Sequence, residues 1–262
     1  MKTYPTGTKE WACKNFNVCS GCKNDCRYCY AKSMAIRFGR RTAETWKDQI
    51  PLPDKLAEVG GGKPTRIMFP STHDITSEHL DLCMEALNRM LSRKHTVLVV
   101  SKPHADCIRA ICEQFGEYKD KMLFRFTIGS ADNNALKFWE PNAPLFEERM
   151  LSLEIAHQSG YQTSVSCEPM LDCAVEKVVE FSLPLVTDSI WIGIMNDIGG
   201  RLKINGADAD TLTKGKALVQ SHNREWISGL YLRLKDNPKI RWKDSIKKML
   251  DLERPTMPGL DT

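Results

Sequence analysis

Three cysteines lie close together near the start of the chain, Cys22, Cys26 and Cys29, in the spacing C-x3-C-x2-C. Thiolates are soft ligands that suit iron–sulfur clusters. Three of them on one tight loop can hold a cubane [4Fe–4S] cluster by three of its irons, which leaves the fourth iron open. The spacing therefore predicts a cluster with one iron free to bind a cofactor.

Two other metal sites use similar cysteines. Cys19 extends the run to C-x2-C-x3-C-x2-C, and four thiolates could surround one structural zinc ion. Zinc ribbons usually separate their two cysteine pairs by a dozen or more residues, so this run is too compact for two facing knuckles. A bacterial ferredoxin run reads C-x2-C-x2-C-x3-C-P, which the chain lacks. We therefore expect Cys13 and Cys19 to be thiols near the cluster that do not bind it.

The segment CKNDCRYCYA, from Cys22 to Ala31, resembles the signature of the radical S-adenosylmethionine (radical SAM) enzymes. The resemblance implies two cofactors, a [4Fe–4S] cluster and SAM, whose amino acid end is chelated by the open iron. It also implies reductive cleavage of SAM to a 5′-deoxyadenosyl radical and an external electron donor of the flavodoxin or ferredoxin type. Tyr28, just before the last cysteine, is then expected among the cofactor-binding residues.

Short apolar runs alternate with amphipathic helical segments. The runs predicted to be strands are 11–16, 66–69, 96–101, 123–128, 163–167 and 190–194. Leu80, Met84, Leu87 and Leu91 repeat at three- and four-residue intervals between two of these runs, which predicts a helix with one apolar face. Strands separated by helices pair in parallel through right-handed crossovers, so we expect an α/β fold whose parallel sheet is covered by helices.

Six such units, with the cysteine loop after the first strand, are similar to the partial (β/α)6 barrel of TIM type found in radical SAM enzymes, where active residues lie at the carboxyl ends of the strands. The 262 residues, 42% hydrophobic and 27% charged, fit one domain over 1–262. Its barrel core is expected at about 11–195, with a C-terminal loop and helices at 196–262. Within that part, 199–206 is predicted to be a mobile lid. No basic and apolar leader and no long apolar run is found, so we expect a cytoplasmic enzyme outside membranes.

Polar residues after the second and third predicted strands are candidate SAM ligands. Many radical SAM enzymes place Gly-Gly-Glu after the second strand, but this chain has Ser71 and Thr72 there, whose hydroxyls could bind the SAM ammonium group. The run VLVVSKP, ending at Pro103, resembles the strand that ends in Thr-Lys in spore photoproduct lyase-like proteins. That resemblance implies that Lys102 lies against the SAM carboxylate. A lysine that simply ends a strand in water is the alternative.

Later blocks extend the resemblance. TIGS, from Thr127 to Ser130, looks like the fourth strand of the same branch, with one of these two residues facing the cofactor. The segments 30–39 and 166–171 resemble a phage-associated radical SAM family of unknown substrate. Glu168 could accept hydrogen bonds from the SAM ribose, or it could form an ion pair with a nearby Arg or Lys. Cys167 is the candidate hydrogen donor, but it alternates with Glu168 along the strand, so both cannot point inward.

The substrate is less defined than the cofactors. Net charge is +4, and residues 1–50 hold ten Lys and Arg against four Asp and Glu. Two basic stretches with an aromatic residue, 37–41 around Phe38 and 241–243 around Trp242, suggest a nucleic acid or nucleotide substrate. A solvated surface explains such charge equally well. Modification of a peptide or protein, or a zinc-stabilised nucleic-acid-binding module without catalysis, are the alternative functions.

Overall fold

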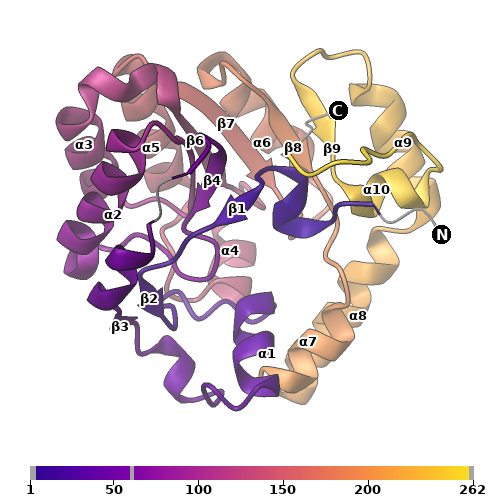
Figure 1. The fold of residues 1–262 in the computed structure, drawn as a ribbon. Helices are drawn as coiled ribbons and strands as arrows, with labels where there is room; N and C mark the ends of the chain where they lie inside the picture. Colours follow the sequence, from indigo (N-terminus) through magenta and orange to yellow (C-terminus); the bar gives the residue numbers. More distant parts are fainter. Residues whose placement is uncertain (1–3, 60–61, 260–262) are drawn as a thin grey trace.

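A computed structural model describes residues 4–59 and 62–259, and its centre is a seven-stranded parallel sheet (Figure 1). The strand order is β1-β4-β5-β6-β7-β8-β9, so β1 and β9 form the two edges and the sheet is a partial barrel. The strands are β1 (Lys14–Asn15), β4 (Arg66–Phe69), β5 (Thr96–Ser101), β6 (Met122–Thr127), β7 (Gln162–Cys167), β8 (Ile190–Ile192) and β9 (Ile240–Trp242). A small antiparallel pair, β2 (Cys19–Ser20) and β3 (Ile50–Pro51), flanks the cysteine loop.

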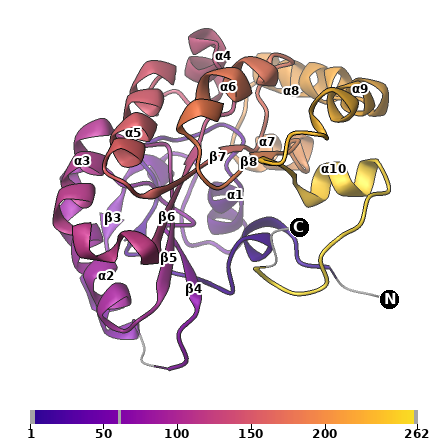
Figure 2. The ribbon, with the colours of Figure 1, turned by 90° about the horizontal axis from the view of Figure 1, so that it is seen from above.

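Helices cover the outside of the sheet, and α2, α3, α5 and α6 line its outer side in the view from above (Figure 2). The helices are α1 (Tyr30–Arg37), α2 (Leu80–Ser92), α3 (Ala105–Gln114), α4 (Asn133–Trp139), α5 (Phe146–Gln158), α6 (Val175–Ser182), α7 (Ile198–Ile204), α8 (Ala209–Ser221), α9 (Arg224–Leu234) and α10 (Asp244–Met249). Short 3-10 helices cover Gly7–Glu10, Thr45–Lys47, Pro53–Glu58, Ser77–His79, Gly116–Lys121 and Leu183–Leu185.

The α/β fold predicted from the sequence is confirmed, with parallel strands and the cysteine loop after the first of them. Strands β4 and β5 have the predicted bounds, and the ends of β6, β7 and β8 differ from the predicted ones by one or two residues. The first strand, predicted at 11–16, is only Lys14–Asn15. The alternation of side chains along β5 explains why the runs are so apolar. Val97 and Val99 pack outward under the helices, while Leu98 packs inward with Trp11 and Met68.

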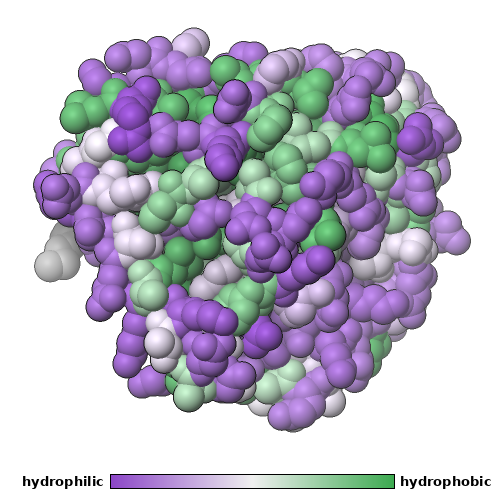
Figure 3. Space-filling model, turned by 180° about the vertical axis from the view of Figure 1, so that it is seen from behind, coloured by the Kyte–Doolittle hydropathy of each residue, from purple (hydrophilic) through white to green (hydrophobic). Residues whose placement is uncertain are grey.

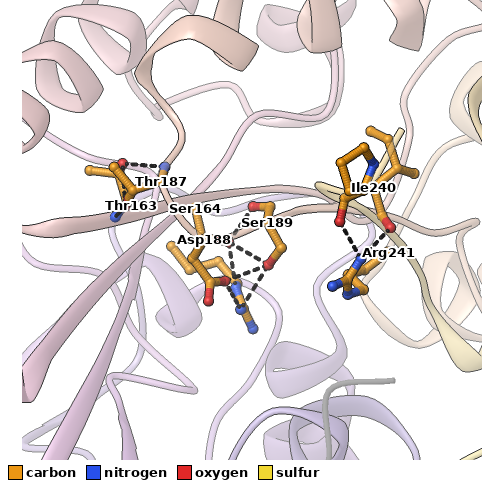
Figure 4. Close-up of polar contacts among 9 residues, drawn as sticks. Thr163, Ser164, Thr187, Asp188, Ser189, Ile240 and Arg241 are labelled. Atoms are coloured by element: carbon orange, nitrogen blue, oxygen red, sulfur yellow. Dashed lines mark hydrogen bonds and ion pairs between the residues drawn. The ribbon is translucent and has the colours of Figure 1, made fainter. Parts of the chain in front are cut away.

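Strand β9 is an element that the sequence analysis did not predict, and it changes the interpretation of residues 241–243. Ile240 pairs with Ile190 of β8. Trp242 and Lys243 are buried, and the Arg241 guanidinium donates to the backbone carbonyls of Pro238 and Ile240, 2.7 and 3.0 Å away (Figure 4). The prediction of a basic, aromatic surface here is therefore wrong, because strand pairing turns two of the three side chains into the protein.

The predicted mobile lid at 199–206 is also wrong. Most of this stretch belongs to helix α7, which packs beside α1 below the sheet in Figure 1. Ile198 and Leu202, four residues apart, are buried against Tyr28 and its neighbours. Burial of this apolar pair outweighs the low helix propensity of Gly199 and Gly200.

A polar network lies inside the sheet, near the amino ends of its strands (Figure 4). The buried Arg125 guanidinium donates to Ser164 Oγ at 2.9 Å and to Asp188 Oδ2 at 3.2 Å, and it lies 4.9 Å from the ring centre of Trp11. Ser189 Oγ donates to the same Asp188 carboxylate at 2.5 Å. The network thus places buried charge inside the sheet, close to Trp11, which also lines the cavity at the carboxyl ends of the strands.

Hydrophilic residues predominate on the face of the molecule that Figure 3 shows. Seen from behind, hydrophobic residues are scattered among hydrophilic ones (Figure 3). Such single exposed apolar residues are normal on protein surfaces. In the described part of the chain, none of the helices combines the length and the apolar character needed to cross a membrane.

Candidate cofactor-binding site

A cavity of about 400 Å³ opens at the carboxyl ends of the strands. In parallel barrels this edge carries the functional residues, because the strand-to-helix loops converge there. The cysteine loop forms one wall, the segments after β4 to β8 form others, and residues 6–11 contribute Thr6, Gly7, Thr8 and Trp11. The predicted site residues that line it are Cys22, Cys26, Tyr28, Cys29, Ser71, Thr72, Lys102, Thr127 and Glu168.

The cysteine loop is held by backbone hydrogen bonds that bring its three thiols to this wall. The amide of Cys22 donates to the Trp46 carbonyl at 2.9 Å, and that of Cys29 to the Cys26 carbonyl at 3.1 Å. Gly21 has φ of +87°, and a Cβ there would lie 2.6 Å from the Trp46 carbonyl oxygen, so only glycine allows this approach. Cys29 is the N-cap of α1, and its sulfur accepts from the amide of Lys32.

The chemistry of the three thiols fits a metal cluster. Burial raises the pKa of Cys22, Cys26 and Cys29, while the ammonium of Lys102 lowers each of them. In the protein alone burial prevails and the thiols keep their protons. Iron would replace those protons, because the thiolate is the form that binds metal. Lys102 and the N-terminus of α1 would then offset part of the negative charge.

Cys19 lies apart from the other three cysteines. It is buried in the main hydrophobic core with Val18 and Leu56, and it is not among the described residues that line the cavity. Nor do any three His, Cys, Asp or Glu side chains within residues 4–59 and 62–259 converge on one point where a single metal ion could bind. A zinc site needs four ligands close around one ion, whereas a cubane cluster needs three thiols spread around a larger group.

Lys102 belongs to a buried network that includes Tyr28. Its Nζ lies 3.8 Å from Glu140 Oε1 and 5.9 Å from the ring centre of Tyr28. The Tyr28 hydroxyl donates to Glu140, and Arg149 Nη2 lies 2.5 Å from Glu140 Oε2. Burial would raise the pKa of Glu140, but Arg149 and Lys102 together hold it below the ordinary value. The ionised Glu140 therefore fixes the Tyr28 ring and the Lys102 ammonium at the cavity wall.

Asp74 joins the cysteine loop to the end of β5. Its carboxylate accepts from Ser101 Oγ, from the Lys102 amide at 3.1 Å and from Asn24 Nδ2 at 2.9 Å. Asp74 also lines the cavity and is 5% exposed. These bonds occupy most of its lone pairs, so Asp74 serves mainly to position the segment that carries Lys102.

Ser71 and Thr72 are held at the cavity by Asn17 and Tyr30. Asn17 Oδ1 accepts from both backbone amides at 2.8 Å, and Ser71 Oγ accepts from Asn17 Nδ2 at 2.9 Å. The Tyr30 hydroxyl donates to the Ser71 carbonyl. A hydroxyl oxygen has two lone pairs, so Ser71 Oγ could accept a second hydrogen bond from an ammonium group in the cavity.

Glu168 forms an ion pair with Lys243, a residue that the sequence analysis did not place in the site. Lys243, at the end of β9, places its Nζ 3.2 Å from Glu168 Oε2, 2.8 Å from Glu10 Oε1 and 3.8 Å from the ring centre of Trp11. The ion pair left open by the sequence is therefore present, and Glu168 still lines the cavity. A Cβ on Gly193 would lie 2.8 Å from Lys243 Cγ, which explains the glycine. The sequence around Lys243, Ile240-Arg241-Trp242-Lys243, carries no apolar run that would have marked a strand or a site residue.

Two predicted site residues lie away from the cavity. Ser130 is fully buried, donates to the Asp172 carboxylate and accepts from the Asp132 amide at 2.8 Å. Cys167 is fully buried in the main hydrophobic core. Neither is among the described residues that line the cavity. Glu168 takes the inward position, as the alternation along a strand requires.

His73 provides a pH-dependent contact under the cavity. Its Nε2 accepts from the Val18 amide at 3.1 Å, and its Nδ1 lies 3.0 Å from the Asp74 carbonyl oxygen. Burial lowers the pKa of His73 to about 4, from 6.5. The folded state therefore binds this proton less readily than the unfolded state, and stability falls as pH falls from about 6.5 to about 4.

We expect the titration of His73 to lower the free energy of unfolding by about 2 kcal/mol between pH 7 and pH 5. In the His73→Gln variant the amide side chain can still donate and accept but does not titrate. The free energy of unfolding of this variant should therefore fall by about 2 kcal/mol less over the same pH range. Urea unfolding of both proteins at pH 7, 6 and 5 measures the difference. Equal losses would mean that His73 is not held neutral by the fold.

Known proteins match this chain in structure only. No protein-family model matches the chain, and a search of curated proteins finds no relative. A variant of spore photoproduct lyase with bound AdoMet and a dinucleoside spore photoproduct superposes with a TM-score of 0.58 at 15% identity, covering 92% of this chain and 79% of that one. The chain has the fold of this protein.

SuiB of Streptococcus suis is a second structural neighbour. Its complex with S-adenosylmethionine has a TM-score of 0.56 at 11% identity, covering 94% of this chain and 54% of SuiB. Its complex with the precursor peptide SuiA has a TM-score of 0.51, also at 11% identity. The partial barrel implied by the resemblance to radical SAM enzymes is thus the architecture shared with these solved structures.

Proposed function

We propose that this protein is a radical SAM enzyme that binds one [4Fe–4S] cluster through Cys22, Cys26 and Cys29 and holds SAM beside it. The observation that carries the proposal is the meeting of these three thiols with Lys102 in one cavity at the carboxyl ends of the strands. The fold supports it, because two structural neighbours bind S-adenosylmethionine.

Each residue of the cavity has a separate task in this proposal. The Lys102 ammonium binds the SAM carboxylate, and Ser71 and Thr72 accept from the SAM ammonium. The Tyr28 ring, held by Glu140, forms the wall beside the cluster loop. Glu168 accepts from the ribose hydroxyls, with its carboxylate held in place by the Lys243 ammonium. When bound, this cofactor pair supplies reductive cleavage of SAM to a 5′-deoxyadenosyl radical, with an electron from an external flavodoxin- or ferredoxin-type donor.

The substrate is proposed to be a nucleobase or nucleotide from which hydrogen is abstracted.

All ten cysteines are free thiols, which fits our proposal of a cytoplasmic enzyme, since cytosolic thiols are kept reduced. We do not assign the hydrogen-donating role to Cys167, because its thiol belongs to the main hydrophobic core.

Anaerobic reconstitution with iron and sulfide tests the proposal. We expect a brown protein with four irons per chain that, with dithionite and SAM, forms 5′-deoxyadenosine. A colourless protein that retains one zinc ion per chain would instead support the zinc-stabilised module. A protein that binds iron but forms no 5′-deoxyadenosine would contradict the radical reaction but not the cluster site.

Lys102→Ala is expected to weaken SAM binding by about 1.5–3 kcal/mol, the range for a hydrogen bond to a charged group. The carboxylate of SAM leaves water when it binds, so it needs the compensating cation. Isothermal titration calorimetry on the loaded protein measures the change. Glu140 keeps its contact with Arg149 in this variant, so folding and iron content should stay normal.

The exposed Lys137 of α4 offers the matched control, and Lys137→Ala should leave SAM affinity unchanged. Equal affinities for the Lys102 variant and this control would place the carboxylate of SAM elsewhere.

A further inference from the structure

Helix α1 carries a row of large apolar side chains on its outer surface. Tyr30, Met34 and Phe38 follow one another at four-residue intervals and are 40, 41 and 61% exposed. The adjoining side of the helix, with Ala31 and Ala35, is buried. Residues four apart lie on one side of a helix, so the three side chains form a continuous exposed stripe about 12 Å long.

The stripe begins at the cavity. The Tyr30 ring lines the cavity wall, where its hydroxyl is anchored to the Ser71 carbonyl. Arg201 of α7 also lines the cavity, and its guanidinium carbon lies 6.0 Å from the Tyr30 ring centre. A molecule lying on the stripe would therefore reach the candidate cofactor site directly past Tyr30 and Arg201.

The other end of the stripe is shaped by the end of α1. Gly39 has φ of +64°, and the amide of Arg40 donates back to the Ala35 carbonyl at 2.9 Å. This reversal of the chain is the common glycine-dependent helix ending. It places the Arg40 guanidinium carbon 5.5 Å from the ring centre of Phe38.

Positive charge accompanies the aromatic residues. Arg37 and Arg40 are exposed and Arg201 is half-buried, and none of the three forms an ion pair with a carboxylate in the described parts of the chain. Arg41 is different, because its guanidinium donates to the Ser20 carbonyl at 3.0 Å. Three arginines beside the stripe thus keep their charge available for an anionic ligand.

We propose that this surface binds a single-stranded nucleic acid and leads one of its nucleotides into the cavity. Bases can stack on Tyr30 and Phe38, while phosphates pair with the free guanidinium groups. This inference rests on the proposed function and names its substrate as a polymer. The unpaired charge favours a polyanion over a neutral peptide, since a peptide would leave the guanidinium groups without partners.

Salt-dependent binding of a fluorescent ten-nucleotide single strand to the cluster-loaded protein tests the proposal. Each phosphate contact on a single strand contributes about 0.7 to the slope of log K against log salt. Arg37→Ala with Arg40→Ala should therefore reduce the slope by about 1.4. Arg93→Ala with Arg109→Ala, two exposed arginines after α2 and on α3, is the matched control and should leave the slope unchanged.

Phe38→Ala should weaken binding of the single strand by about fivefold to 150-fold, the effect of losing one stacked base. No binding of the single strand at 50 mM salt, equal slopes in both double variants, or tighter binding of a peptide of equal negative charge would each overturn the inference. All variants should form 5′-deoxyadenosine at the rate of the unmodified protein without substrate. If the unmodified protein formed no 5′-deoxyadenosine, the proposed function would be contradicted, whether or not the protein binds the oligonucleotide.

Discussion

Replacing any one of Cys22, Cys26 and Cys29 by alanine is expected to abolish both iron binding and SAM cleavage. Three thiolates are the fewest that hold a cubane cluster while one iron stays open, so no member of the set is dispensable. The thiols come from a single loop fixed by the Trp46 carbonyl, and no other cysteine lines the cavity within the described residues. Iron and sulfide analysis after anaerobic reconstitution measures the loss.

Cys13→Ala and Cys19→Ala are the matched controls and should keep both iron and SAM cleavage. Cys13 is exposed, and Cys19 packs in the main hydrophobic core. Cys19→Ala leaves only a small cavity, so the variant should fold. If it lost its metal as completely as Cys22→Ala, a four-cysteine site would be present and the radical SAM function would be wrong.

Arg149→Met is expected to lower the free energy of unfolding by about 3–5 kcal/mol, the cost of breaking a buried ion pair from one side. Arg149 is fully buried, and its guanidinium donates to the carbonyls of Pro144 at 2.7 Å and Thr127 at 3.1 Å as well as to Glu140. Methionine fills a similar volume but satisfies none of these acceptors. Glu140 would retain the more distant Lys102, 3.8 Å away. Urea unfolding measures the change.

An exposed ion pair provides the comparison. Arg233 lies 2.8 Å from Glu176, and its side chain is 50% exposed, so Arg233→Met should cost less than about 1 kcal/mol. Adding Glu140→Gln to Arg149→Met should recover part of the loss, because the unpaired charge is then removed. Equal effects of the two arginine substitutions would mean that the Glu140 network does not hold the site together.

The fold was largely predictable because the central strands of its sheet, β4 to β8, are mostly buried. Strands β4 and β5 each contain an uninterrupted apolar run, 67–69 and 97–100, which marks their positions in the sequence. Strand β9 has only three residues, too few to establish a period. Helix α7 was missed because Gly199 and Gly200 suggested a loop, whereas tertiary burial of Ile198 and Leu202 decided the structure.

The site was predictable only where its residues share a local motif. The three cysteines and Tyr28 lie within eight residues, and Lys102 ends a recognisable strand. The carboxylate that organises them, Glu140, is 112 residues from Tyr28 in sequence, so only the fold brings the two together. The thiol of Cys167 could not be placed by spacing alone, because a one-residue difference in strand alternation decides between cavity and core.

Lys243 has a consequence for how the protein is made. Its ammonium binds the Gly7 carbonyl at 3.1 Å, 236 residues away in sequence, and it also joins Glu10 to Glu168. A nascent chain still lacking β9 would hold two acidic side chains with no cation between them. The part of the cavity wall built from residues 6–11 therefore depends on a lysine more than 230 positions later in the sequence, and a product truncated before β9 would lack the cation that joins this wall to Glu168.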